Sequence, residues 1–174
     1  MSDENVKSAN DNPNQDNNAQ QQMPPIVINT QYIKDFSLEI PHAPEVFRNL
    51  NQAPAVNIHV DVNASHMHEN FFNVELSIAM DGDLIDEKLF ILELKYAAIV
   101  SLNVPKEHVE PILLVEIPRM LFPFARSIVT NALVDGGLPP FMLNPIDFVA
   151  MYQNRQAQQA QRPAAQPEPA NKPE

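Results

Sequence analysis

The sequence predicts an α+β domain: a four-stranded antiparallel sheet, one long amphipathic helix and a C-terminal helix. Two observations lead to this prediction. In the first half, four segments alternate apolar and polar residues without a crossover helix between them, which is typical of an antiparallel sheet. In the second half, the run from Ile117 to Gly137 places apolar residues at spacings of three and four, as an amphipathic helix requires.

The four expected strands lie at residues 26–40, 56–63, 72–80 and 87–100. Apolar residues occupy most even positions of the first strand, so one face should be buried and the other solvated. Proline-rich residues 41–54 link the first two strands, and Asp81-Gly82-Asp83 is expected to form the turn before the fourth. The fourth strand differs because both of its faces carry apolar side chains.

The long helix is expected to start near Leu121 or Pro123, because proline is tolerated in an entry segment and a first turn. Gly136 and Gly137 should end it through a positive φ angle. Residues 106–116 could form a short helix or a connecting loop. The predicted buried stripe comprises Leu121, Phe124, Ala125, Ile128, Val129, Ala132 and Leu133.

The apolar segment Leu138 to Leu143 is expected to cross to a last helix that runs through Tyr152. Asn144 fits as its N-cap and Pro145 as its first helical residue. Asp147 would place a favourable negative charge in the first turn.

Composition limits the possible classes of protein. Residues 26–152 contain 16 acidic and 7 basic side chains, a formal charge of −9, so this domain should repel nucleic acid and anionic lipid and favour a basic partner. The chain has no cysteine, which excludes disulfides and thiolate sites.

Both ends of the chain are expected to lie outside the folded domain. Residues 1–25 are polar and should be disordered, and residues 153–174 should form a loose tail whose first turns could extend a helix. The N-terminus lacks the charged and apolar regions of a signal peptide, and no apolar run is long enough to span a bilayer. We therefore expect a cytoplasmic protein without direct membrane insertion.

No enzymatic motif is present. The serines lie outside any nucleophile elbow, and three glycines cannot build a phosphate-binding loop, so we expect neither catalysis nor a cofactor. The best candidate metal cluster comprises His59, Asp61, His66, His68 and Glu69. A solvated strand edge with two loop histidines is the favoured interpretation, because zinc sites need a firmer framework.

Four motifs in order resemble one family. They are Tyr32–Pro44, Phe90–Glu93, Met120–Arg126 (MLFPFAR) and Gly137–Phe148 (GLPPFMLNPIDF). Together they resemble the SecB family of bacterial protein-export chaperones, over roughly Gln31 to Tyr152.

The resemblance implies a SecB-like fold over residues 26–152 and a holdase that works without ATP. Such a protein binds unfolded preproteins, keeps them competent for translocation and delivers them to the SecA motor. The family assembles as a homotetramer, a dimer of dimers.

The resemblance also assigns a docking surface. Asp35 and Glu39 are four residues apart on one strand, so they should point the same way, and Glu93 belongs to the polar register of the fourth strand. Such a face is usually just solvated. In the family, however, the residues matching Asp35, Glu39, Ile91 and Glu93 form the docking surface for SecA.

More large apolar side chains are present than one sheet face and one helix stripe can cover, which indicates an interaction surface as well as a core. The candidates for a client-binding groove are Phe71, Phe72, Leu113, Leu114, Phe122, Phe141, Met142 and Leu143. The candidates for oligomer contacts, or for the core behind them, are Leu92, Leu94, Tyr96, Phe124 and Ile128.

The sequence departs from the family where Ala97-Ala98 replaces an expected glycine pair, which should stiffen the fourth strand. Two alternatives stay open at this point. One is a SecB-like chaperone tied to a stress or toxin system. The other is a small zinc-binding or ligand-binding domain that uses the cluster from His59 to His68.

Overall fold

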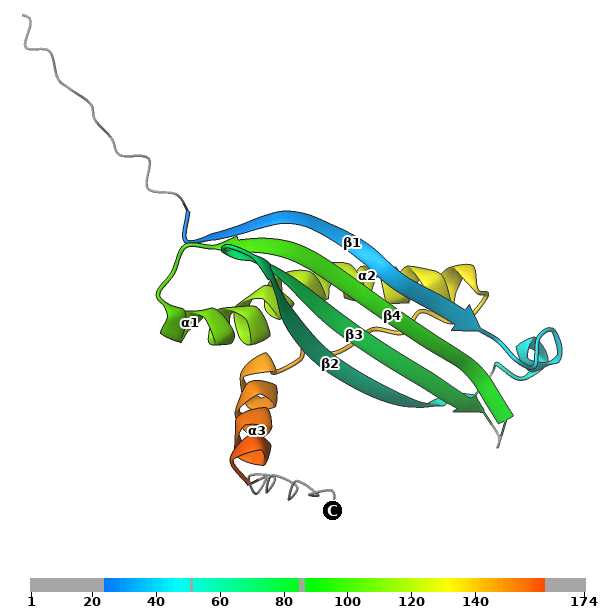
Figure 1. The fold of residues 1–174 in the computed structure, drawn as a ribbon. Helices are drawn as coiled ribbons and strands as arrows, with labels where there is room; N and C mark the ends of the chain where they lie inside the picture. Colours follow the sequence, from blue (N-terminus) through cyan, green and yellow to red (C-terminus); the bar gives the residue numbers. More distant parts are fainter. Residues whose placement is uncertain (1–23, 51, 85–86, 162–174) are drawn as a thin grey trace, which may run out of the picture.

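The computed structural model describes residues 24–161 except 51 and 85–86, and it confirms the predicted α+β class (Figure 1). The predicted disorder of residues 1–25 lies almost entirely outside the described residues, as does the expected tail beyond residue 161. The elements are β1 (Ile26–Glu39), the 3-10 helix η1 (Glu45–Asn49), β2 (Ala55–His68), β3 (Phe71–Leu84), β4 (Glu87–Leu102), α1 (Lys106–Pro111), the π-helix η2 (Ile112–Glu116), α2 (Ile117–Asp135) and α3 (Phe148–Gln161).

The sheet has the strand order β1-β4-β3-β2, and every neighbouring pair is antiparallel. Because β1 pairs with β4 rather than with β2, the link that carries η1 joins the two outermost strands. β3 and β4 therefore form the centre of the sheet, and β1 and β2 form its edges.

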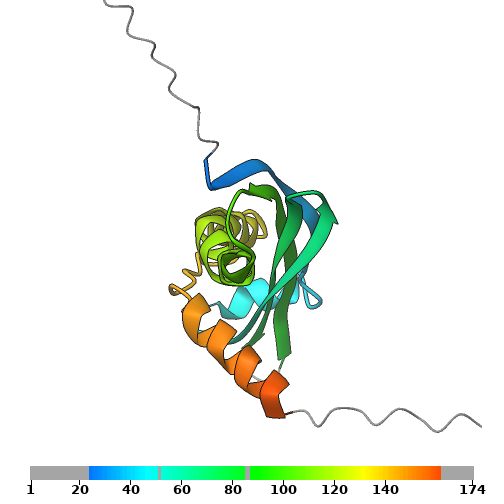
Figure 2. The same cartoon turned by 60° about the vertical axis from the view of Figure 1, so that its left-hand side comes forward.

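The long helix α2 packs on one face of β3 and β4. Figure 2 shows the helices on that side of the sheet, and no described element covers the opposite face. Leu76, Ile78 and Leu92 from the sheet, and Leu121 and Val129 from α2, are each almost completely buried. Because burying one such side chain contributes about 1.5–3 kcal/mol, this single layer of contacts accounts for much of the stability.

Two β-bulges in β1 change which side chains face the helix. They lie around Asn29 and Lys34 and reverse the alternation between them. Tyr32 consequently points away from α2, while Ile33 pairs with Tyr96 on the helical side. The prediction of one apolar face along all even positions is therefore wrong for Tyr32.

Gly82 does not form the turn predicted from the sequence, since β3 continues to Leu84. Gly82 pairs with Phe90 on β4. A Cβ atom at this position would lie 2.8 Å from Cδ1 of the buried Phe90 ring. The glycine is therefore needed to admit an aromatic ring into the core.

The helical layer starts earlier than predicted. α1, η2 and α2 form one continuous run from Lys106 to Asp135, so the open question about residues 106–116 resolves to helix and the expected start near Leu121 is wrong. Within η2 the turns widen, and the N–H of Ile117 donates to the carbonyl of Ile112. Pro111 and Pro118 flank this widened segment, where the regular backbone hydrogen-bond pattern is already changed.

The buried face of α2 is rotated relative to the predicted stripe. Leu121, Ala125, Val129 and Leu133 are buried as expected. Phe124, however, is 52% exposed, and Phe122 is buried in its place. Phe122 packs edge-on against Phe148 of α3, at 6.1 Å between ring centroids.

The ends of α2 and α3 are set by local chemistry. Gly137 has a φ of +80°, and its N–H donates to the carbonyl of Val134, which confirms the predicted stop at this glycine. The predicted positive φ at Gly136 is wrong, since its φ is −73°. The predicted start of α3 at Pro145 is wrong. Oδ1 of Asp147 accepts the N–H of Ala150 at 3.0 Å, so Asp147 is the cap and the helix begins at Phe148. It continues past Tyr152 to Gln161.

The contact between Gly82 and Phe90 gives a first test. Gly82→Ala should lower the free energy of unfolding by about 1–3 kcal/mol, because the added methyl overlaps a ring that the core holds in place. Chemical denaturation measures this effect. Gly136→Ala serves as a graded comparison. Its φ of −73° suits alanine, but the added Cβ would lie 3.0 Å from Cδ2 of Leu38, so a smaller loss is expected there. Combining Gly82→Ala with Phe90→Leu should recover part of the loss, and full stability of Gly82→Ala would contradict this account.

Candidate functional site

The four residues predicted to dock SecA lie together on the uncovered face of the sheet. Glu39 pairs with Ile91 across β1 and β4, and Glu93 pairs with Ser37 one step along. Asp35 follows at the next position on the same face. The three carboxylates are exposed and Ile91 is half-buried. Two adjacent strands therefore present an acidic patch, defined here as Asp35, Glu39, Ile91 and Glu93.

Few cations neutralise the acidic patch. Lys95 approaches Asp35 at 3.6 Å, and both side chains are about half exposed, so this contact stabilises little. Among the described residues, Glu39 and Glu93 have no ion-pair partner. The patch therefore retains net negative charge available to a partner.

A second acidic group lies next to the acidic patch on the same sheet face, since Asp81 of β3 pairs with Ile91 of β4. The hydrogen bond from Lys88, and then the one from Asn57, holds the pKa of Asp81 below its ordinary value. The hydrogen bonds to Asp81 and Asp83 in turn raise the pKa of Lys88. Both shifts favour the charged forms, so this cluster stays ionised at neutral pH.

Two side chains of β1 reach across β4 to β3 next to the acidic patch. Lys34 Nζ donates to Glu75 at 2.6 Å, and Tyr32 Oη donates to Asn73 at 2.9 Å. Ala97 is the β4 residue between the paired positions Tyr32 and Glu75, and it is fully buried. The small alanine therefore leaves room for bridges that tie the edge strand to the centre of the sheet.

The predicted oligomer residues separate into two groups. Leu92, Leu94 and Tyr96 lie on the helical side of β4, where they are buried in the core of this chain. Phe124 and the half-buried Ile128 lie instead on α2 outside its buried stripe. The structure therefore places the first group in the core and leaves the second accessible.

Sequence reasoning missed other exposed apolar side chains. Met120 lies one turn before Phe124 on α2, and it is 45% exposed. Ile33 and Phe36 are exposed on β1, which is an edge strand. The exposure of these side chains depends on which face of α2 is buried and on the two bulges of β1. The spacing of apolar residues in the sequence predicts neither feature.

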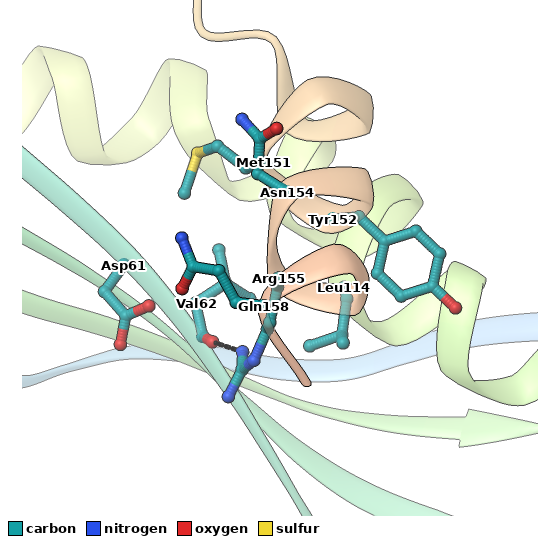
Figure 3. A pocket seen from close by; sticks show the side chains of 8 residues that line it. All are labelled: Asp61, Val62, Leu114, Met151, Tyr152, Asn154, Arg155 and Gln158. Carbon is teal, nitrogen blue, oxygen red and sulfur yellow. Dashed lines mark hydrogen bonds between the residues drawn. The ribbon is translucent and has the colours of Figure 1, made fainter. Parts of the chain in front are cut away.

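The predicted groove residues gather around two parts of the helical layer. Phe72, Leu113 and Leu114 line a cavity of about 320 Å³ between the β2–β3 pair and η2. Leu114 also lines an adjacent cavity of about 370 Å³ between β2 and α3 (Figure 3). Phe71 pairs with His68 at the end of the same hairpin.

The second part is the segment that joins α2 to α3. Phe141 lines a cavity of about 320 Å³ with Leu50 and Phe90. Met142 and Phe122 line another, of about 550 Å³, against α2. Leu143 is 2% exposed, so it anchors the segment in the core and does not line these cavities.

The histidine cluster is spread rather than convergent. The ring of His66 hydrogen-bonds the carbonyl of Glu69 and packs edge-on against Phe72. His68 stacks near Phe71. Within residues 24–161 that the structure describes, no group of three or more potential metal ligands converges. The structure thus gives the zinc hypothesis no support.

Among the described helices, none is both long enough and apolar enough to cross a membrane.

Comparison with known proteins identifies the family. The family model described as preprotein translocase subunit SecB matches residues 19–159. A protein-export protein SecB of Rhodospirillum rubrum is 48% identical, with 80% of this chain and 88% of the relative covered. One of Paramagnetospirillum magneticum is 47% identical, covering 78% and 88%.

A solved structure shows the same fold at low sequence identity. It is the Mycobacterium tuberculosis SecB-like chaperone Rv1957 in complex with a ChAD peptide from the HigA1 antitoxin. Its TM-score is 0.59 at 13% identity, with 70% of this chain and 91% of that chain covered. Because the family model spans most of the chain and close relatives share nearly half of its residues, this protein belongs to the SecB family.

Proposed function

We propose that this protein is a protein-export chaperone that binds unfolded preproteins without ATP, keeps them competent for translocation and delivers them to SecA. Membership of the SecB family is the observation that carries the proposal. The relatives at 47–48% identity are named for protein export, which favours this function over a chaperone of a stress or toxin system. The cytoplasm, where preproteins meet SecA, is the expected location.

The apolar cavities support client binding. Phe141 and Met142 lie on opposite sides of the segment that joins α2 to α3, and each lines a cavity. Met142 is 61% exposed, so its flexible thioether is available to a client. Two mainly apolar cavities, together with two of mixed lining beside β2, suit an extended chain that makes many weak contacts. A bound chain is removed from aggregation by mass action.

Met142 provides a test of client binding. Met142→Gln should weaken binding of reduced, carboxymethylated α-lactalbumin about fivefold, because a partly buried apolar side chain contributes about 1 kcal/mol to binding. Isothermal titration calorimetry measures the change. Met67→Gln is the control, since Met67 is also exposed but lies at the end of β2. Equal effects of the two substitutions would contradict a role for this segment.

The acidic patch supports docking of SecA. Its carboxylates lie on the sheet face opposite the helices, so a client on the helical side leaves the patch free. A basic partner module would be attracted to the patch, and Ile91 would add an apolar contact. The two binding functions are therefore proposed to lie on opposite faces of one sheet.

Charge reversal tests this docking surface. Asp35→Lys or Glu93→Lys should each weaken SecA binding about tenfold at low salt, since each replaces an attraction with a repulsion at the interface. Thermal melting should remain near the parent value because both side chains are exposed. Asp135→Lys makes the same charge change at the end of α2 and serves as the control. Unchanged SecA affinity in both sheet variants would count against the proposal.

We further propose that the protein assembles as a homotetramer, a dimer of dimers. The exposed apolar side chains Met120, Phe124 and Val134 on α2 support this proposal, as do Ile33 and Phe36 on the edge strand β1. Such a concentration of exposed apolar groups on two elements is typical of an interface between subunits.

A charge introduced on the exposed side of α2 tests this assembly. Phe124→Asp should shift the molar mass measured by light scattering from tetramer to smaller species, because a carboxylate is costly to bury in an apolar interface. Val149→Asp, on α3, provides a control of similar exposure. A tetrameric mass for Phe124→Asp would show that this side of α2 is not an interface.

A further inference from the structure

The acidic patch is too small to be a complete docking surface. Its four residues lie on two neighbouring strands and cover three successive cross-strand positions. With about 4.8 Å between strands and about 7 Å between successive side chains on one face, these positions span roughly 5 by 14 Å. Specific interfaces commonly bury about 800 Å² on each partner. A partner that docks on the patch must therefore also contact residues around it.

The strand β3 continues the patch across the sheet. On one side of the patch β1 is the edge of the sheet, and on the other side β4 adjoins β3. Asp81 pairs with Ile91, and Ala79 pairs with Glu93, so Asp81 and Ala79 lie on the same face as the patch. We call these two residues the β3 extension.

A cation separates the patch from β3 at the third cross-strand position. Lys95 of β4 pairs with Asp35 on one side and with Ser77 on the other, and its Nζ lies 3.6 Å from Oδ2 of Asp35. A basic partner is repelled there, whereas the β4 residues that pair with the β3 extension are apolar or acidic. The charges therefore favour contact with the β3 extension over contact with Ser77.

The carboxylate of Asp81 is held in place by one of its two oxygens. Oδ2 accepts hydrogen bonds from Lys88 at 2.8 Å and from Asn57 at 3.2 Å. Among the described residues no donor reaches Oδ1, so this oxygen can accept a hydrogen bond from a partner. Lys88 also lies 2.7 Å from Asp83, so two carboxylates share one cation and the group keeps a net negative charge. A carboxylate that is already ordered loses little conformational freedom on binding.

Ala79 supplies an apolar surface between polar neighbours. It is half-buried and lies between Glu93 of β4 and His59 of β2. The half-buried Ile91 is one cross-strand position away on β4. Ala79 and Ile91 thus form an apolar centre with carboxylates around it, and an apolar centre with a polar rim is the usual anatomy of a protein interface.

We propose that the docking surface for SecA extends from the acidic patch onto β3, where Asp81 accepts a basic side chain of the partner and Ala79 enlarges the apolar centre that Ile91 begins. The surface then spans three strands instead of two. This inference rests on the proposed docking of SecA, and it adds two residues that determine how tightly the partner binds.

The charge of the extension is tested with full-length SecA at low salt. Asp81→Asn should weaken binding about fivefold, because it removes a positioned carboxylate from the interface. Asp61→Asn is the matched control. Asp61 is exposed on the same sheet face, where it pairs with Ser77 beyond Lys95, so the same loss of charge should change the affinity by less than about twofold. Isothermal titration calorimetry measures both affinities.

A neutral substitution tests the apolar contact and does not disturb the bonds of Asp81. Ala79→Gln should also weaken SecA binding about fivefold, because a longer polar side chain keeps the partner away from the apolar centre. Ser77→Gln introduces the same side chain on the same strand, next to Lys95, and should bind SecA like the parent. Thermal melting of both variants shows whether the sheet is intact.

The outcomes separate the extension from the proposed docking on the patch. Equal losses in Asp81→Asn and Asp61→Asn would show that SecA responds only to the total charge, and would overturn the role of Asp81. An affinity of Ala79→Gln equal to that of Ser77→Gln would overturn the apolar contact on β3. If Glu93→Lys weakens binding while both β3 variants bind like the parent, docking on the patch stands and the extension fails. If the parent does not bind SecA, the proposed function fails and the extension fails with it.

Discussion

The packing of α2 against one face of the sheet is the contact on which the rest of the structure depends. It buries the helical sides of β3 and β4 under a single helix stripe that includes Leu121 and Val129. Because one helix is narrower than four strands, the edge strands and the flanks of the helix keep apolar groups exposed, such as Ile33 and Phe124. Within the part of the chain that the structure describes, the same arrangement leaves the opposite sheet face without a covering layer (Figure 2). A one-sided core thus creates both an apolar side and a polar side.

The two sides differ in chemistry in the way that two different partners would require. The polar side carries carboxylates such as Glu39 and Glu93, which have no ion-pair partner among the described residues. Such charges act at long range and make the rate of encounter with a partner sensitive to salt. The apolar side offers several cavities, among them those lined by Phe141 and Leu114, which act only on contact. The sheet between them is tied to its edge strand by bridges over Ala97. Binding of a partner to one face of the sheet therefore need not distort the other face.

Periodicity in the sequence was sufficient for the fold class, the antiparallel sheet and the glycine stop of α2, since these depend on local backbone preferences. The face of Tyr32, the role of Gly82 and the burial of Phe122 could not be predicted, because each depends on a partner distant in sequence. The pairing of β1 with β4 brings the residues of the acidic patch onto one face, as the four-residue spacing of Asp35 and Glu39 predicted. The sequence pattern did not predict the hydrogen bond from Arg155 of α3 to the carbonyl of Val62 on β2, because it depends on a contact made only in the folded chain.

The most direct test of the account is amide hydrogen exchange of the full protein, alone and with a reduced, unfolded precursor, with SecA, or with both. The account predicts that the precursor protects the segments around Leu114 and Phe141, that SecA protects the β4 segment around Glu93, and that both footprints persist in the ternary mixture. Overlapping footprints, or displacement of the precursor by SecA binding at the same segments, would contradict the assignment of two functions to opposite sides of one sheet.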